Sequence, residues 1–189
     1  MIEIIEDKVL AHYHSPLHLV TFATDSEKKN TKKWEIYMRP NGAAVLPYNP
    51  QTGKVILVKQ FRLPAYIRYE NSNGHTLETC AGLIDKGETP EETIRREALE
   101  EIGYELKEIQ FVSKALSTPG AVTEQVYLFV APYDHNMKKQ EGGGLANEGE
   151  DIEIIEMDYK EAYAAIADNK LYDMKTIILL QHLRLAGLM

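Results

Sequence analysis

The chain has 189 residues, of which 44% are hydrophobic, 26% are charged and 8% are aromatic, and its formal net charge is −8. This balance suits one globular domain with a small appendage, and it excludes a disordered, collagen-like or coiled-coil chain. The 21 lysines and arginines are scattered among 29 acidic residues, so no basic stripe is available to neutralise a nucleic-acid backbone. We therefore expect a small ligand and no nucleic-acid partner.

The cysteine content and the hydropathy of the chain indicate the cellular compartment of the protein. Cys80 is the only cysteine, so no intrachain disulfide can form and a reducing environment is the simplest assignment. The amino end lacks a basic stretch followed by an apolar one, and nowhere do 18 apolar residues run together. We expect a soluble, cytoplasmic protein with no membrane partner.

The first half of the chain has the pattern of a β protein. Apolar and polar residues alternate in short stretches, which predicts strands, and the segment Asn49–Gly53 predicts the turn of a hairpin. We expect residues 1–40 to form an N-terminal antiparallel β segment and residues 41–189 to form the main domain. The expected strands cover Ile2–Ile5, Leu17–Phe22, Trp34–Met38, Lys54–Phe61 and Thr76–Ala81.

Helices enter in the second half. Thr89 is a candidate N-cap, Pro90 suits the first helical position, Glu92 completes a capping box, and Gly103 ends the helix. The expected fold is mixed α/β, with a curved sheet between helices. The remaining expected elements are strands at Ile109–Leu116, Gln125–Ala131 and Ile152–Met157, a long loop at Asp134–Asp151, and helices at Tyr159–Ala167 and Asp173–Leu185.

The helix that begins at Thr89 carries a group of acids. At about 100° per residue, Glu97, Glu100 and Glu101 fall on one side of it, beside an apolar stripe that would be buried. Like charges this close repel one another unless a cation neutralises them. Oxygen ligands, without a Cys or His pair at zinc-ligand spacing, favour Mg²⁺, with Mn²⁺ as the alternative. Arg96 can brace the acids or a phosphate oxygen.

Taken alone, an Arg-Glu-x-x-Glu-Glu sequence is most often a solvated acidic helix face. Here it belongs to a longer pattern, G-x5-E-x7-R-E-U-x-E-E-x-G-U, which begins at Gly82 and in which U is a bulky or aliphatic residue, with Ala98 at the first U. The chance of seven fixed residues coinciding at a given start is on the order of 10⁻⁹. This pattern is the Nudix box, and the sequence resembles a Nudix hydrolase.

The resemblance extends over nearly the whole chain and points to the nucleoside-diphosphate-sugar branch. It implies a Nudix fold, an α/β/α sandwich, and metal-dependent hydrolysis of a pyrophosphate bond, with GDP-mannose giving GMP and mannose 1-phosphate as the first expectation. ADP-ribose, giving AMP and ribose 5-phosphate, is the alternative, and a nucleotide-sugar sensing module without turnover is a third reading. The flanking motifs that carry the resemblance are Gln60-Phe-Arg62, Cys80-Ala-Gly, Ser117–Glu124, Gly142-Gly-Gly, Glu150-Asp-Ile-Glu and Asp173-Met-Lys175-Thr.

The same resemblance implies roles for individual residues. The metal ligands would be Glu97, Glu101, the carbonyl of Ala81, and Glu150 from the long loop, for which Glu148 or Asp151 could substitute. Catalysis would involve Glu100, Glu101, Glu124 and Glu150. Each role has a plainer alternative, such as a solvated loop acid or a surface ion pair. The expected substrate contacts are Lys33, Trp34, Glu35, Arg62, Glu124 and Lys175, with His14 beside the base.

Assembly is the last property that the resemblance implies. It predicts a homodimer in which the N-terminal β segment reaches across to the partner and helps to complete each pocket. Cys80, Gly82 and Gly103 are expected to serve packing and turns rather than chemistry.

Overall fold

The computed structural model describes residues 2–25, 27–69, 72–145 and 151–189. The chain forms two compact units, which are described separately. The N-terminal unit comprises Met1–Gly42 and Lys114–Val126, and the main unit comprises Ala43–Ser113 and Tyr127–Met189.

A three-stranded antiparallel sheet forms most of the N-terminal unit, in the order β1 (Glu3–His12), β2 (Pro16–Ala23) and β3 (Thr31–Tyr37). The three predicted strands are therefore confirmed, although β1 continues well beyond Ile5. Every residue of β1 is exposed, so pairing with β2 rather than burial of one face determines its length. Residues 114–126 join this unit because Tyr37 exchanges backbone hydrogen bonds with Ala121 and Thr123 (2.8 and 3.1 Å).

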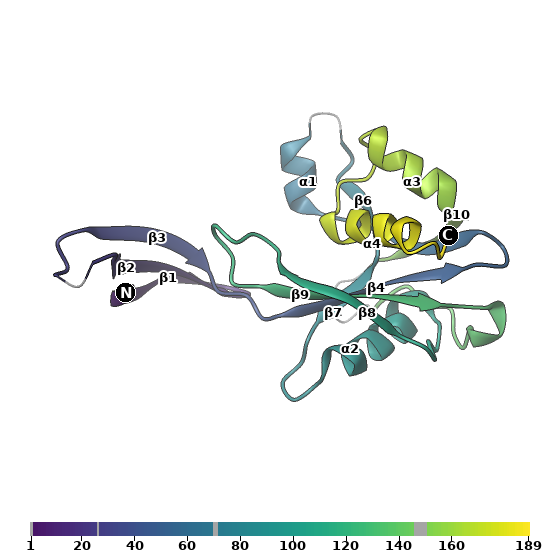
Figure 1. Ribbon diagram of the computed structural model, residues 1–189, viewed down its shortest axis with the longest axis horizontal. Helices are drawn as coiled ribbons and strands as arrows, with labels where there is room; N and C mark the ends of the chain where they lie inside the picture. Colours follow the sequence, from purple (N-terminus) through teal and green to yellow (C-terminus); the bar gives the residue numbers. More distant parts are fainter. Residues whose placement is uncertain (1, 26, 70–71, 146–150) are drawn as a thin grey trace. The chain divides into compact units, whose positions relative to one another are not determined.

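The central sheet of the chain has seven strands (Figure 1). The order is β10 (Glu153–Asp158), β5 (Lys54–Phe61), β4 (Gly42–Asn49), β9 (Gln125–Pro132) and β8 (Gln110–Leu116); β6 (His75–Glu78) pairs with β5 and β7 (Cys80–Leu83) with β4. The predicted strand at Thr76–Ala81 is thus two short strands divided at Thr79, each with a different partner.

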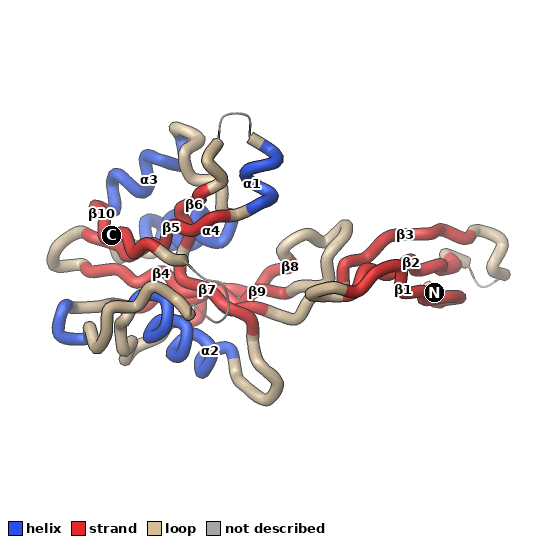
Figure 2. The backbone as a smooth tube through the Cα atoms, turned by 180° about the vertical axis from the view of Figure 1, so that it is seen from behind, coloured by secondary structure: helices blue, strands red, loops and turns tan. Residues whose placement is uncertain are grey.

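Helices cover both faces of this sheet in the main unit, which confirms the α/β/α architecture. Helices α1 (Leu63–Arg68), α3 (Tyr159–Ala167) and α4 (Met174–Leu185) lie on one side, and α2 (Pro90–Glu97) lies on the other (Figures 1 and 2). Strand β4 is buried along its whole length because side chains on both of its faces are covered. Helix α1 was not predicted: it has six residues and no buried side chain, so it shows no helical periodicity.

Helix α2 begins as the sequence predicted and ends differently. Thr89 and Glu92 form the reciprocal capping box, and Gly103 terminates the segment in the left-handed conformation, with φ 79°. The last turn, Ala98–Ile102, is a π-helix rather than the expected α-helix. The angular spacing of about 100° per residue therefore does not extend to Glu100 and Glu101.

Packing of the box segment against the sheet fixes its position. The apolar stripe predicted beside the acids is completely buried, since Ile94, Ala98 and Ile102 are all 0% exposed. These residues share a core cluster with Val45, Ile56, Val58, Phe129 and others. The acids of the box are consequently carried by a rigid, buried segment rather than by a loop.

The long loop between β9 and β10 packs on the end of the box segment. Gly143 and Gly144 donate backbone hydrogen bonds to the carbonyls of Glu101 and Glu100 (2.8 and 3.1 Å). Both glycines have positive φ angles (103° and 80°), a conformation that favours glycine. No helix in the described residues is both long and apolar enough to cross a membrane.

Candidate active site

The guanidinium of Arg96 holds the box together. It forms two hydrogen bonds with Glu88 (Nε–Oε1 3.0 Å, Nη2–Oε2 3.1 Å), and its Nη1 reaches Glu97 Oε1 at 2.7 Å and Glu100 Oε2 at 3.1 Å. Its Nη2 also donates to the carbonyl of Leu83 (3.3 Å). The hydrogen bonds with Arg96 lower the pKa of Glu88 to about 2 and raise the pKa of Arg96 itself. Arg96 therefore braces the acids, as its position on the helix predicted.

Two of the three box acids are buried. Glu97 is 8% exposed and Glu101 is 2% exposed, whereas Glu100 keeps about a quarter of its side chain in solvent. The backbone N–H of Ala81 donates to Glu101 Oε2 (3.0 Å). A methyl group on Gly82 would lie only 1.8 Å from Glu97 Oε1, so glycine is needed for this close approach. The structure thus brings Glu97 and Glu101 to the Ala81–Gly82 backbone.

A second charged cluster lies in the main unit, where the ends of β5, β6 and α4 meet. Arg62 donates two hydrogen bonds to Glu78 (Nε–Oε1 2.8 Å, Nη2–Oε2 2.9 Å). Lys175 Nζ lies 2.6 Å from Asp173 Oδ1 and 3.7 Å from Glu78 Oε2. Arg62 and Lys175, two of the predicted substrate contacts, therefore share one carboxylate.

Electrostatics stabilise the charged form of this carboxylate. Glu78 is 5% exposed, and its burial disfavours the charged form, but hydrogen bonds from Arg62 and Thr76 and the charge of Lys175 outweigh the burial and lower the pKa of Glu78. The hydrogen bonds with Glu78 likewise raise the pKa of Arg62. Glu78 and Arg62 therefore form a charged pair at neutral pH.

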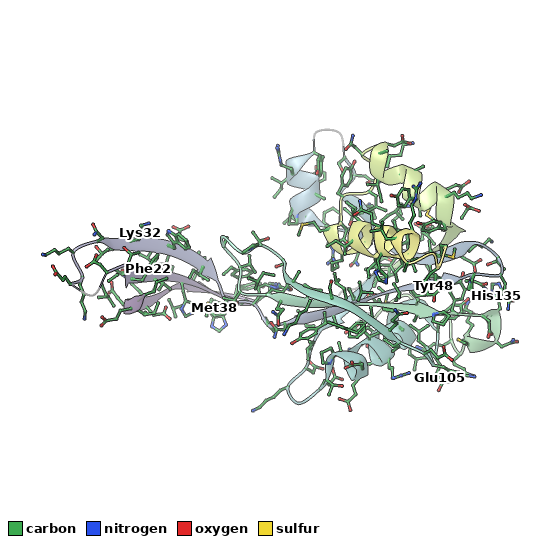
Figure 3. All side chains as sticks on the ribbon, viewed as in Figure 1. Phe22, Lys32, Met38, Tyr48, Glu105 and His135 are labelled. Carbon is green, nitrogen blue, oxygen red and sulfur yellow. The ribbon has the colours of Figure 1, made fainter. Side chains whose placement is uncertain are left out.

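The predicted base-binding residues lie in the N-terminal unit. Lys33, Trp34 and Glu35 are exposed on β3, and the ring of Trp34 meets that of Phe22 edge-on at 5.3 Å. Figure 3 labels Phe22 on its strand in this unit. Trp34 is 52% exposed, so it does not belong to the core.

Two further predicted residues belong to the same unit. Glu124 lies in residues 114–126, and its Oε1 is 3.7 Å from Arg39 Nη2, so this carboxylate is paired rather than merely exposed. His14 is exposed at the turn between β1 and β2, where its ring meets that of Tyr13 edge-on.

Comparison with known proteins decides the family. The family model described as NUDIX domain matches residues 38–176. This chain belongs to the Nudix hydrolase family. The match includes the box, the strands that carry it, and the cluster of Arg62, Glu78 and Lys175.

Several relatives of this Nudix hydrolase are similar to it over nearly their whole length. The chain is 41% identical over 191 residues to the GDP-mannose pyrophosphatase of Cronobacter sakazakii. The aligned region covers 100% of this chain and 97% of the relative. It is 42% identical over 190 residues to the protein of the same name from Pectobacterium atrosepticum (98% and 95% covered). The corresponding protein of Yersinia enterocolitica is also 42% identical over 190 residues (100% and 97% covered).

Nudix hydrolases generally use divalent metal ions, and the donor set of this chain fits such an ion. Two buried carboxylates, Glu97 and Glu101, lie beside the backbone of Ala81, so the available ligands are all oxygen atoms. Within the described ranges, no three His, Cys, Asp or Glu side chains already gather around a metal position. Glu148 and Glu150, predicted to supply another acid, lie outside the described residues, and Asp151 is exposed.

Two residues that organise the second cluster were not predicted from the sequence. Glu78 and Asp173 were not assigned roles, although each pairs with a predicted substrate-binding cation of this Nudix hydrolase. A signal was present in the alternation of Thr76 and Glu78. Two polar residues at positions i and i+2 of a strand share one face, and here that face is buried. The partner of each was not predictable, because Arg62, Glu78 and Lys175 are far apart in the chain.

Proposed function

We propose that this Nudix hydrolase cleaves the pyrophosphate bond of a nucleoside diphosphate sugar, with GDP-mannose as its substrate and GMP and mannose 1-phosphate as products. The observation that carries this proposal is the pair of buried carboxylates, Glu97 and Glu101, on the box segment. The choice of sugar nucleotide rests on relatives named GDP-mannose pyrophosphatase that are about 40% identical over nearly the full chain.

We assign the metal to the acids of the box. Glu97, Glu101 and the carbonyl of Ala81, together with an acid from the loop at Glu148, Glu150 or Asp151, would hold Mg²⁺, with Mn²⁺ as a substitute. When bound, the metal would neutralise phosphate oxygens and lower the pKa of the attacking water. The side chain of Arg96 supports this arrangement, since its hydrogen bonds orient Glu97 and Glu100.

Side chains of the protein would bind the substrate and accept the proton. Arg62 and Lys175 would bind the diphosphate, and because Nε and Nη2 of Arg62 already donate to Glu78, its Nη1 would face the phosphate oxygens. Water attacks one phosphorus, the bond from that phosphorus to the bridging oxygen breaks, and a carboxylate accepts the water's proton. The candidate acceptors are Glu100, Glu101, Glu124 and Glu150. Trp34 and Glu35 would bind the base, Lys33 would contact the substrate, and Glu124 would contact the substrate or position the water.

The experiment is a substrate panel. Purified chain is incubated with GDP-mannose, ADP-ribose and other nucleotide sugars in the presence of Mg²⁺, Mn²⁺ or EDTA, and phosphatase-susceptible phosphate is measured. We expect turnover of GDP-mannose that EDTA abolishes and added Mg²⁺ restores. If ADP-ribose is cleaved in preference to GDP-mannose, the substrate is ADP-ribose, the alternative. If nothing on the panel is cleaved and a nucleotide sugar only raises the Tm, the chain is a sensing module.

We also propose a homodimer formed through the N-terminal β segment, residues 1–40, with residues 41–189 as the catalytic domain. In support of this, β1 is an edge strand of its sheet, and its apolar side chains Ile4, Ile5, Val9 and Leu10 are each more than 40% exposed. Light scattering should give twice the chain mass of 21.5 kDa. A monomer mass at working concentration would refute the dimer.

We also propose a cytoplasmic location, which the single, buried Cys80 supports.

A further inference from the structure

Glu78 stands between the two cations that the proposed function assigns to the diphosphate. Its two carboxylate oxygens accept from Nε and Nη2 of Arg62 at 2.8 and 2.9 Å, a side-on, two-point geometry that fixes the plane of the guanidinium. Its Oε2 is also 3.7 Å from Lys175 Nζ. One buried carboxylate thus contacts cations from two segments that are more than a hundred residues apart in the chain.

The Glu78 side chain is itself held in place. Thr76, on the same face of β6, donates its hydroxyl to Glu78 Oε1 at 2.6 Å. The next residue, Thr79, receives support from α4, because its backbone N–H donates to Thr176 Oγ1 at 2.7 Å. Thr176 in turn donates to Asp173 Oδ2 (2.6 Å), the N-cap of α4 and the partner of Lys175. The segment around Glu78 and the start of α4 are therefore one hydrogen-bonded structure.

The three side chains of this cluster differ in their exposure to solvent. Glu78 is buried, whereas the side chains of Arg62 and Lys175 are 46% and 25% exposed. The cations therefore reach solvent while the carboxylate that aligns them does not. An arginine with Nε and Nη2 occupied presents its remaining N–H groups in one direction, which lowers the entropic cost of binding an anion.

We propose that Glu78 is a positioning residue for substrate binding: it holds the Arg62 guanidinium and the Lys175 ammonium in the orientation that receives the diphosphate. This inference rests on the proposed function, because it assigns those two cations to the diphosphate. Glu78 acts through Arg62 and Lys175 and contacts no reacting atom.

A positioning role and simple electrostatics predict opposite changes in substrate affinity for Glu78→Gln. The substitution removes a negative charge beside two cations, so Coulomb attraction alone would tighten the binding of an anion. If Glu78 positions the cations, the same substitution weakens binding, because the amide group of glutamine places N–H groups against the N–H groups of Arg62. We expect KM for the nucleotide sugar to rise about tenfold or more, with a smaller change in kcat.

Further variants separate positioning from loss of structure. Glu78→Asp keeps the charge one methylene further back, and its KM should lie between those of the wild type and Glu78→Gln. Glu156→Gln is the matched control, since Glu156 is a partly buried carboxylate of β10 that accepts from Tyr133 (2.7 Å) and Lys54 (3.4 Å) and has no assigned role in binding. It should lower the Tm without raising KM. In an Arg62→Ala/Lys175→Ala background, Glu78→Gln should change KM by less than about twofold.

Binding of inorganic pyrophosphate, measured by calorimetry without turnover, makes the test independent of the substrate assignment. We expect Glu78→Gln to weaken this binding about tenfold. Unchanged or tighter binding, or a wild type that binds no pyrophosphate, overturns the role of Glu78. A wild type that binds pyrophosphate more tightly than Glu78→Gln but cleaves no nucleotide sugar refutes the proposed function alone.

Discussion

The carboxylate of Glu88 and the guanidinium of Arg96 form a two-point ion pair, with Nε–Oε1 at 3.0 Å and Nη2–Oε2 at 3.1 Å. Glu88 belongs to the turn before α2, and Arg96 lies on the helix itself, two turns further along. The pair thus closes the turn from β7 onto the helix that carries the box acids. Thr93, one turn into α2, adds a hydroxyl hydrogen bond to Glu88 Oε2 (2.9 Å).

This ion pair should make stability depend on acid pH. The pKa of Glu88 is lowered from 4.5 to about 2, chiefly by its hydrogen bonds with Arg96, so folding favours the ionised form. The stabilisation is complete above pH 4.5 and is lost as the pH falls through about 2. We expect the Tm of the wild type to fall more steeply over this range than the Tm of Glu88→Gln. Glu108→Gln, at an exposed loop position, should follow the wild-type curve.

Glu101→Gln should remove turnover and leave the fold intact. Glutamine retains an oxygen that accepts the hydrogen bond from the Ala81 N–H, but it removes the negative charge assigned to the metal. We expect kcat to fall by at least about 100-fold. Circular dichroism and the Tm should remain close to those of the wild type.

The control for Glu101→Gln is Glu91→Gln, on the exposed first turn of α2. It should have a normal kcat. Near-normal turnover in Glu101→Gln would mean that the assignment of this carboxylate to the metal is wrong.

Gly82→Ala should harm activity more than stability. The added methyl group would lie 1.8 Å from Glu97 Oε1 and 2.0 Å from its carboxyl carbon, so the Glu97 side chain must move. A displacement of this size in a catalytic group can lower kcat/KM roughly 100-fold. Gly120→Ala is the matched control, because no atom lies within 4 Å of its added methyl group. Equal activities in the two variants would contradict the requirement for glycine at position 82.

Thr89→Ala should destabilise the start of α2. The Thr89 hydroxyl accepts from the Glu92 N–H (3.3 Å), and Glu92 accepts in return from the Thr89 N–H (2.8 Å). Loss of this cap should lower the free energy of unfolding by about 1 kcal/mol in urea titrations. Thr89→Ser keeps the hydroxyl and should stay within about 0.5 kcal/mol of the wild type. An equal loss in both variants would show that the hydroxyl is not responsible.

Features that depend on neighbouring residues could be predicted from the amino-acid sequence. Thr89, Pro90 and Glu92 define the start of the box helix and Gly103 its end, because caps and left-handed termini act within one or two turns. The position of the buried stripe followed from helical periodicity, and most strands followed from alternation. The family followed from the seven fixed residues of the box. Their types and their intervals can both be read along the chain, so no tertiary contact was needed to recognise them.

Features that depend on contacts between distant segments became known only from the folded chain. The last turn of the box segment is π-helical, a local geometry that no periodicity in Ala98–Ile102 predicted. The pairing of Arg62 with Glu78, and of Glu78 with Lys175, brings together the ends of two strands and the start of the last helix. Charges on separate elements meet only after the sheet and helices have packed, so their partners cannot be deduced from sequence neighbours.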